Sequence, residues 1–327
     1  MNTEGITVMM NITEVQNSRT PVLQISDDDN LIFIKREDFL PFSFGGNKVR
    51  IALEFLDDMK QQGAGCIVGY GGIKSNLNRA LANICSRERI PCHLIVSSDT
   101  PEKEAESFNS LMASSFGARF YFCRKSEVKE TIDKVLSSLR NDGLVPYYIY
   151  GDSSGAGNEH IPLRAYEKVY REIRNRYDYI FLATGTGMTQ AGLLAGKALC
   201  RGNEKIIGIS VARTSLQESA VIRKYLLCYS ERTRKIDIPE SNVDDSCLCG
   251  GYGLYNTGIE ETIRYQMNTN GIPLDPVYTG KAFWGMQEYL KRNRIQGKKV
   301  LFIHTGGSPL FFDYYLSKTS ERKIENL

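Results

Sequence analysis

The most chemically suggestive feature of this sequence is a lysine that follows a pair of glycines. Lys48 ends the segment FGGNK (44–48). A lysine held in such a turn forms a Schiff base readily once burial or a neighbouring cation lowers its pKa, because only the neutral amine attacks a carbonyl. Taken alone, the segment also allows a plainer interpretation, a solvated lysine that opens a helix.

A second glycine turn, ATGTGMT (183–189), has the composition of a phosphate-binding loop. Glycines let backbone N–H groups wrap an anion, threonine hydroxyls add donors, and the following helix directs its positive end inward. The segment has neither the G-x-x-x-x-G-K-[ST] pattern of P-loops nor the complete G-x-G-x-x-G of dinucleotide sites. It predicts a compact phosphate ester rather than a nucleotide, with an ordinary tight turn as the alternative.

The elements that must position these turns alternate between short apolar runs and helical periods, which is typical of a parallel α/β architecture. Strands are predicted at 31–36, 66–69, 92–97, 119–122, 147–150, 179–183, 205–210 and 299–304. Helices are predicted at 49–62, from Ser75, from Pro101, near 126–140, at 162–176, from Thr189, near 214–228 and near 281–293, with a long irregular region near 231–258. In such sheets ligands bind at the carboxyl ends of strands, where the glycine turns gather.

Five ordered motifs together resemble a known group of enzymes. They are FGGNK, GGIKSN, TGTGMTQAGL, PVYTGKA and HTGG, spread from Phe44 to Gly307. The combination is similar to the fold-type II (tryptophan synthase β-like) pyridoxal-phosphate enzymes, and within them to the aminocyclopropane-carboxylate deaminase and D-cysteine desulfhydrase family. The resemblance implies two open, twisted α/β domains with the cofactor between them. A smaller domain (50–155) would be inserted into a larger cofactor-binding domain (1–49 and 156–327).

The resemblance also implies a role for each matching residue. Lys48 would carry the pyridoxal 5'-phosphate as a Schiff base and later move the Cα proton, and Asn76 would bind the ring hydroxyl. Ser75 would lie beside the substrate carboxylate, and Tyr278 would act as an acid/base or stacking group. The phosphate would be held by Gly185, Thr186, Gly187, Met188 and Thr189, with Thr279 facing the pyridine nitrogen and Thr305 completing the pocket floor.

The side chain at position 279 affects which reaction the cofactor would favour. A carboxylate at the pyridine nitrogen keeps the ring protonated and a strong electron sink, whereas a neutral hydroxyl stabilises charge less. In the family, the deaminase branch has VYEGK and the desulfhydrase branch VYTGK, and this chain has the second. We therefore expect β-elimination from a small amino acid, giving an α-keto acid, ammonia and the released group. Ring-opening deamination, β-replacement, racemisation and a non-catalytic cofactor- or amino-acid-binding protein are the alternatives.

The sequence departs from the family pattern in the substrate region. Lys74 stands where a glutamine is common, and Leu77 where histidine is frequent. The Lys74 ammonium would pair with a second anionic group on the substrate, or else turn to solvent. Tyr252, in GGYGLYN (250–256), is a further candidate substrate contact. Specificity for D-cysteine and the D or L preference stay open.

Composition narrows the class of partner. The 327 residues carry 41 basic and 38 acidic side chains, a formal charge of +3, which excludes a strongly basic nucleic-acid-binding face or a membrane-surface patch. The uncharged stretch 179–196 contains TGTGMTQAG and is interpreted as a strand, loop and helix rather than a membrane span. Eight dispersed cysteines favour reduced thiols in a cytoplasmic protein. No spacing indicates a metal site, and the family implies a homodimer.

Overall fold

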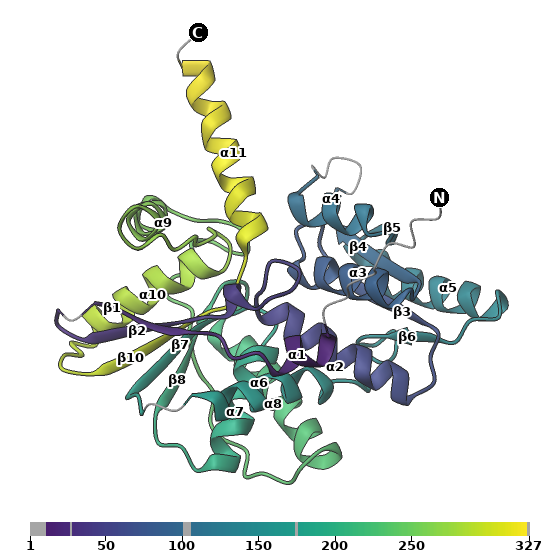
Figure 1. Cartoon of the computed structure of the whole chain (residues 1–327), viewed down its shortest axis with the longest axis horizontal. Helices are drawn as coiled ribbons and strands as arrows, with labels where there is room; N and C mark the ends of the chain where they lie inside the picture. The colour runs from purple at the N-terminus through teal and green to yellow at the C-terminus, as the bar shows by residue number, and fades with distance from the viewer. Residues whose placement is uncertain (1–10, 27, 101–105, 174–175, 326–327) are drawn as a thin grey trace, which may run out of the picture.

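The computed structural model describes residues 11–26, 28–100, 106–173 and 176–325. Its elements form two sheets, shown as the left and right halves of Figure 1. The strands are β1 Val22–Ser26, β2 Leu31–Arg36, β3 Cys66–Gly71, β4 Cys92–Ser98, β5 Arg119–Arg124, β6 Pro146–Tyr148, β7 Tyr179–Thr184, β8 Lys205–Ser210, β9 Asn242–Asp244 and β10 Lys299–His304.

Helices cover both sheets. They are α1 Ile12–Asn17, α2 Asn47–Gln61, α3 Asn76–Glu88, α4 Phe108–Ser115, α5 Val128–Asn141, α6 Ile161–Glu172, α7 Met188–Cys200, α8 Ser215–Arg232, α9 Thr257–Asn270, α10 Thr279–Arg292 and α11 Ser308–Glu325. Short 3-10 turns lie at Glu37–Phe39 and Lys125–Glu127. No helix in the described part of the chain is both long and apolar enough to cross a membrane.

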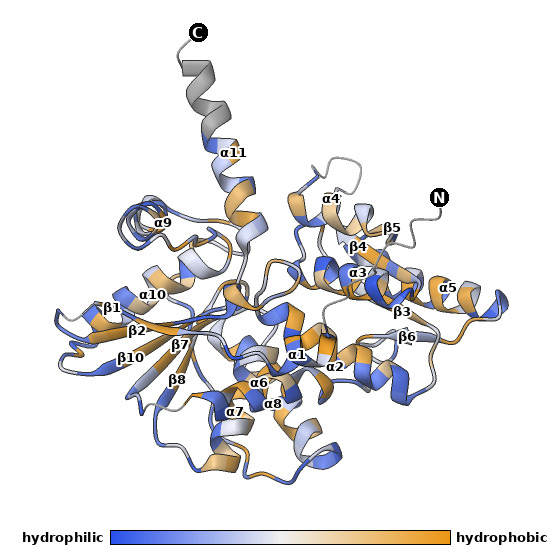
Figure 2. Ribbon diagram, viewed as in Figure 1, coloured by the Kyte–Doolittle hydropathy of each residue, from blue (hydrophilic) through white to orange (hydrophobic). Residues whose placement is uncertain are grey.

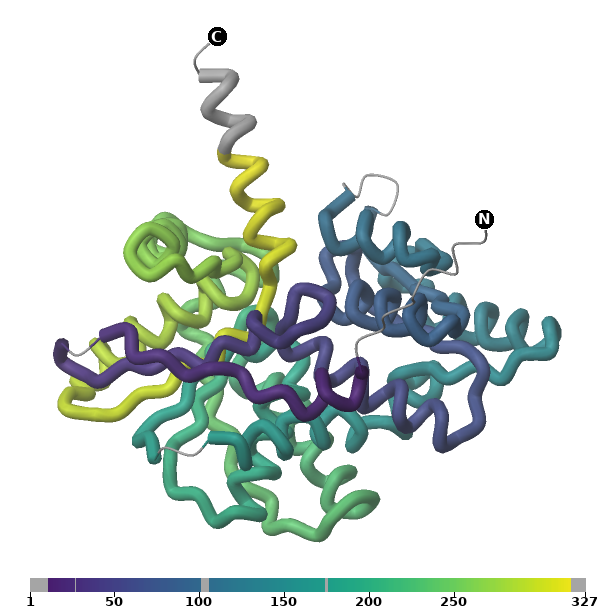
Figure 3. The backbone as a smooth tube through the Cα atoms, viewed as in Figure 1, coloured from purple at the N-terminus to yellow at the C-terminus, as the bar shows by residue number. Residues whose placement is uncertain are grey.

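The larger sheet has the order β1-β2-β10-β7-β8-β9, with β1 antiparallel to β2 and every other pair parallel. Its strands come from both ends of the chain, so β2 pairs with β10 across more than 260 residues of sequence (Figure 3). The smaller sheet, β5-β4-β3-β6, is entirely parallel. Its strands are consecutive in sequence and lie between β2 and β7.

Burial on both faces explains why the central strands read as continuous apolar runs. Along β7, Ile180 and Leu182 pack into one core cluster, with α6 and α7, while Phe181 and Ala183 pack into another, with α9 and α10. In Figure 2 the central strands are largely hydrophobic, whereas the helices alternate between hydrophobic and hydrophilic stretches.

The predicted α/β class is confirmed, and the eight predicted strands are all present. The stretch 179–196 forms β7 and most of α7, as predicted. The strand predicted at 147–150 is wrong at its end, because β6 stops at Tyr148, where Gly151 N–H turns back to the Tyr148 carbonyl at 2.9 Å. The helix start predicted at Pro101 lies outside the described residues. The limits of the two domains at residues 49/50 and 155/156 stay a prediction.

Candidate active site

A cavity of about 210 Å³ lies between the two sheets, at the carboxyl ends of β3, β7 and β10. The smaller sheet contributes Gly71 and the start of α3, and the larger one contributes the turns after β7 and β10. Twelve of the fourteen predicted site residues line it: Lys48, Ser75, Asn76, Leu77, Gly185, Thr186, Gly187, Met188, Thr189, Tyr252, Tyr278 and Thr305. Segments far apart in the sequence thus meet at one place.

Close backbone packing fixes the turn that carries Lys48. Gly46 has φ +93°, and Gly306 of the turn after β10 has φ +97°. A Cβ atom on Gly306 would lie 2.6 Å from the Gly46 Cα atom, so the two turns can pack only as glycines. The Asn47 N–H donates to the Thr305 carbonyl at 3.0 Å. The lysine at the start of α2 is therefore held against the end of β10.

Burial makes Lys48 a reactive amine. Loss of solvation lowers its pKa to about 8, and the carboxylate of Glu218 opposes part of that shift. Glu218 itself is fully buried, and accepts hydrogen bonds from the Thr184 hydroxyl at 2.9 Å and from Arg213 Nη1 at 2.7 Å. A substantial fraction of Lys48 is consequently neutral near physiological pH, as attack on a carbonyl requires.

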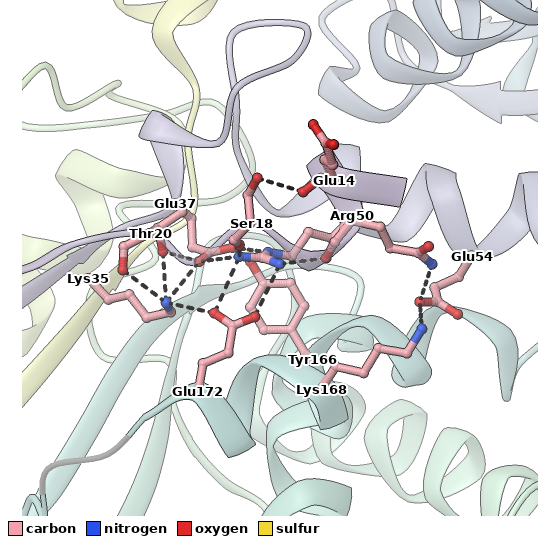
Figure 4. Close-up of polar contacts among 11 residues, drawn as sticks. Glu14, Ser18, Thr20, Lys35, Glu37, Arg50, Glu54, Tyr166, Lys168 and Glu172 are labelled. Carbon is pink, nitrogen blue, oxygen red and sulfur yellow. Dashed lines mark hydrogen bonds and ion pairs between the residues drawn. The ribbon is translucent and has the colours of Figure 1, made fainter. Parts of the chain in front are cut away.

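A buried network of charged side chains holds the first turn of α2 in place (Figure 4). Glu37 accepts from Arg50 Nε at 2.7 Å and from the Tyr166 hydroxyl at 3.0 Å, and its other oxygen lies 3.3 Å from Lys35 Nζ. Glu172, near the end of α6, contacts the same two cations at 3.2 and 3.3 Å. The network joins the end of β2, the first turn of α2, and the middle and end of α6.

The turn after β7 is built as an anion site. Gly187 has φ +77° and caps α7 without a side-chain hydrogen bond, so the first N–H groups of the helix have no partner within it. Asn47 Nδ2 donates to Thr189 Oγ1 at 2.8 Å, which ties this helix to the lysine turn. A phosphate ester at this helix end would lie within reach of the backbone amides and of the Thr186 side chain.

On the opposite side of the cavity, Ser75 caps α3 as predicted, and its Oγ atom accepts from the Asn78 N–H at 3.2 Å. The close fit of the preceding strand requires glycine, because a Cβ on Gly71 would lie 2.9 Å from Ser75 Oγ. Asn76 begins the helix, and Leu77 is 5% exposed. This helix end presents one hydroxyl, one amide and one apolar side chain to the cavity.

Two phenols meet at the cavity wall. The hydroxyl groups of Tyr252 and Tyr278 are 2.6 Å apart, and burial raises the pKa of each. Two residues outside the predicted set hold these tyrosines in position. Asp275 accepts from the Tyr278 N–H at 2.7 Å, and buried Lys281 Nζ donates to the Leu248 and Gly251 carbonyls at 2.9 and 3.0 Å, just before Tyr252. Lys281 belongs to the quoted PVYTGKA segment, which was the available signal.

Two predicted site residues do not line this cavity. Thr279 is fully buried, and its hydroxyl donates to Asp275 Oδ2 at 2.7 Å, so it serves the turn before α10. Thr305, in the turn after β10, is the predicted threonine on that side that lines the cavity. Lys74 is exposed in the broader groove outside the cavity, as the solvent-facing interpretation anticipated. Tyr150, which the motifs missed, lines both spaces.

His304 shapes the turn after β10. It is fully buried, its Nε2 atom lies 3.0 Å from the Pro273 carbonyl, and its Nδ1 atom accepts from the Gly306 N–H at 3.2 Å. Its Nδ1 atom also lies 3.5 Å from Asp38 Oδ1. This histidine therefore holds backbone in place and does not reach the cavity.

Comparisons with known proteins agree with this geometry. The family model described as pyridoxal-phosphate dependent enzyme matches residues 14–306. A candidate 1-aminocyclopropane-1-carboxylate deaminase of Pyrococcus abyssi is 29% identical over 294 residues, 86% of either chain. A D-cysteine desulfhydrase of Salmonella typhi is 28% identical over 87% of this chain and 89% of its own. The crystal structure of an ACC deaminase homologue superposes with a TM-score of 0.81 at 25% identity, covering 96% of this chain and 99% of the other.

Proposed function

Given that the chain belongs to the family of pyridoxal-phosphate dependent enzymes, we propose that it is a lyase that catalyses β-elimination from a small amino acid. The products would be an α-keto acid, ammonia and the released β-group. The observation that carries this proposal is the half-buried lysine amine, whose pKa is lowered, between a helix N-terminus and a hydroxyl-lined wall.

The cavity residues fit pyridoxal 5'-phosphate. The cradle formed by Gly185, Gly187 and the start of α7 would hold the phosphate, and Thr305 would face the ring nitrogen. A Cβ on Gly185 would lie 3.0 Å from Val211 and 3.9 Å from the Tyr278 ring, so this backbone lies close under the cavity wall. When bound, the cofactor supplies an electron sink for the Cα carbanion.

The chain's own residues would divide the remaining work. Lys48 would hold the cofactor and then, as a free amine, remove the Cα proton. Ser75, at the start of α3, would bind the substrate carboxylate, where the helix end favours an anion. Tyr278, hydrogen-bonded to Tyr252, would deliver a proton to the departing β-group or stack against the ring.

We prefer elimination to the other reactions because the described cavity wall carries no acidic side chain. Among the residues described, no Asp or Glu side chain lines the cavity. The ring nitrogen would therefore meet a neutral hydroxyl, which suits a reaction that needs only brief carbanion character before the β-substituent leaves. The Thr279 hydroxyl is bonded to Asp275, and Thr305 at the cavity would offer the ring nitrogen the same neutral chemistry.

Ring opening of 1-aminocyclopropane-1-carboxylate is the second candidate. Two of the similar proteins carry that activity in their names, at 29% and 25% identity. Product analysis separates the candidates: a β-substituted alanine gives pyruvate and the released group, whereas the cyclopropane substrate gives 2-oxobutyrate.

The test is a turnover assay of the cofactor-loaded protein with both enantiomers of cysteine and β-chloroalanine and with the cyclopropane amino acid. We expect pyruvate from at least one enantiomer of a β-substituted alanine, and none from Lys48→Arg, which keeps a positive charge but has no nucleophilic amine. Release of 2-oxobutyrate alone would overturn the elimination proposal in favour of ring opening. Recovery of the opposite enantiomer of the added amino acid would indicate racemisation.

We also propose a homodimer and a cytoplasmic location. Apolar side chains stay exposed on the helix α11 that projects from the body in Figure 1 and on α4, against which it packs: Phe312 at 54%, Leu316 at 58% and Leu111 at 45%. A second copy that covers this surface would bury it. All eight cysteines are free thiols, which suits a reducing compartment. Sedimentation of wild type and Phe312→Ser tests the dimer, with dissociation expected for the variant.

A further inference from the structure

An arginine that pairs with no carboxylate among the described residues is buried beside the candidate site. Arg79, on α3, is 1% exposed and is among the largest fully buried side chains. Its Nη1 atom donates to Asn76 Oδ1 at 3.0 Å and to Asn109 Oδ1 at 2.9 Å, and its Nε atom lies 3.4 Å from Ser43 Oγ. None of the ion pairs found within the described residues includes Arg79.

Burial of an unpaired guanidinium is costly, because the charge leaves water without a counter-ion. Loss of solvation lowers the pKa of Arg79 to about 10, so the side chain still carries its charge near pH 7. Its neighbours are all neutral acceptors, together with the Phe44 ring, whose centroid lies 6.0 Å from the guanidinium carbon. Within the described residues, the site therefore holds a fixed positive charge that no carboxylate pairs with.

The same arginine decides which way Asn76 faces. Asn76 Oδ1 accepts from Arg79 Nη1 at 3.0 Å and from Asn109 Nδ2 at 3.1 Å. Asn109, on α4, is anchored in turn, because its Nδ2 atom also donates to the Lys74 carbonyl at 3.0 Å. With the amide oxygen held by two donors, the Nδ2 group of Asn76 is left to face the cavity that this residue lines.

We propose that Arg79 is a positioning residue that turns the amide N–H of Asn76 toward the cofactor ring and, by its charge, holds the ring oxygen in its anionic form. The inference rests on the proposed function, because it needs pyridoxal phosphate in the cavity. Asn76 donates to the oxygen, and Arg79 behind it supplies the field that favours negative charge there. An anion at the ring would also supply the counter-charge that Arg79 otherwise lacks.

The test measures two quantities on the cofactor-loaded protein: the pH midpoint at which its visible absorption changes, and the Kd for pyridoxal phosphate. Removal of a nearby positive charge raises the pKa of whichever bound group takes up the proton. Arg79→Gln should therefore raise the midpoint by about one pH unit and weaken binding about tenfold. Arg119→Gln, at an exposed arginine on β5 of the smaller sheet, is the matched control and should change neither quantity.

Two further variants separate charge from orientation. Asn109→Leu keeps the charge of Arg79 but removes one of the two donors that orient the Asn76 amide, so the Kd should rise while the midpoint stays in place. Asn76→Asp offers Arg79 a carboxylate and removes the donor, and it should raise the midpoint even if Arg79→Gln does not fold.

A midpoint that is unchanged in both Arg79→Gln and Asn76→Asp would overturn the inference and leave the proposed function standing. A wild-type protein that binds no pyridoxal phosphate would instead refute the proposed function, and this inference with it.

Discussion

Replacing the buried carboxylate of Glu37 by an amide should destabilise the protein strongly, without touching the cavity. Glu37 is fully buried, at the start of the turn that leads to the reactive lysine. It receives hydrogen bonds from Arg50, Tyr166 and, at 2.5 Å, the Thr20 hydroxyl (Figure 4). Glu37→Gln removes the charge but keeps the shape, and leaves Arg50 with Glu172 as its remaining carboxylate.

The size of the effect follows from the pKa of Glu37. Burial alone would raise the pKa, but the charges of Arg50 and Lys35 outweigh burial and lower it from the ordinary 4.5 to about 2. Each pKa unit corresponds to about 1.4 kcal/mol, so the ionised carboxylate contributes about 3 kcal/mol to the free energy of unfolding. Because the folded pKa is the lower one, this contribution is present above pH 4.5 and is lost as the pH falls toward 2.

Urea unfolding with saturating cofactor measures the change. At pH 7 we expect Glu37→Gln to lose about 3 kcal/mol, within the range of about 3–5 kcal/mol known for buried pairs that lose one partner. Between pH 4.5 and 3 the variant should lose less stability than wild type. Glu130→Gln, in an exposed pair with Lys134, is the control and should leave the midpoint unchanged. A Glu37→Gln midpoint equal to that of wild type would refute the reasoning.

Four further predictions concern the cavity. Thr305→Val should shift the visible spectrum of the loaded protein, whereas Thr279→Val should lower thermal stability and leave the spectrum in place, because only Thr305 lines the cavity. Gly306→Ala should weaken cofactor binding measured by titration, since its Cβ would displace the turn before Lys48. Lys281→Met should raise KM with little change in cofactor Kd, because it frees the Tyr252 loop. The rate at which Lys48 captures added cofactor, followed by absorbance, should rise with pH up to about 8 and then level off.

Elements could be predicted from the sequence where a capping or turn residue stands next to a clear apolar pattern. Ser75 is a polar cap before an apolar helical period, and it caps α3 as predicted. Strands buried on both faces, such as β7, stand out as apolar runs bounded by glycine turns. Helix α9 was harder to predict, because Ile259 and Ile263 are the only long apolar side chains that it buries.

The parts of the site that escaped prediction depend on tertiary contacts. Nothing in the segment ESFNSL marks Asn109, whose partners Asn76 and Arg79 lie about 30 residues earlier. Asp275 resembles an ordinary turn residue, and only the packing of Gly307 against its carboxylate shows that it joins two turns of the site. The role of Thr279 at the ring nitrogen stays a prediction, and the motif alone does not show that its hydroxyl also bonds to Asp275.

Chemical trapping shows whether Lys48 carries the cofactor. The protein loaded with pyridoxal phosphate is reduced with borohydride, digested, and mapped by mass spectrometry. The structure predicts one reduced phosphopyridoxyl group, on the peptide that contains Lys48. A label on Lys74 or Lys281 instead, or cofactor binding that leaves no covalent label, would contradict it.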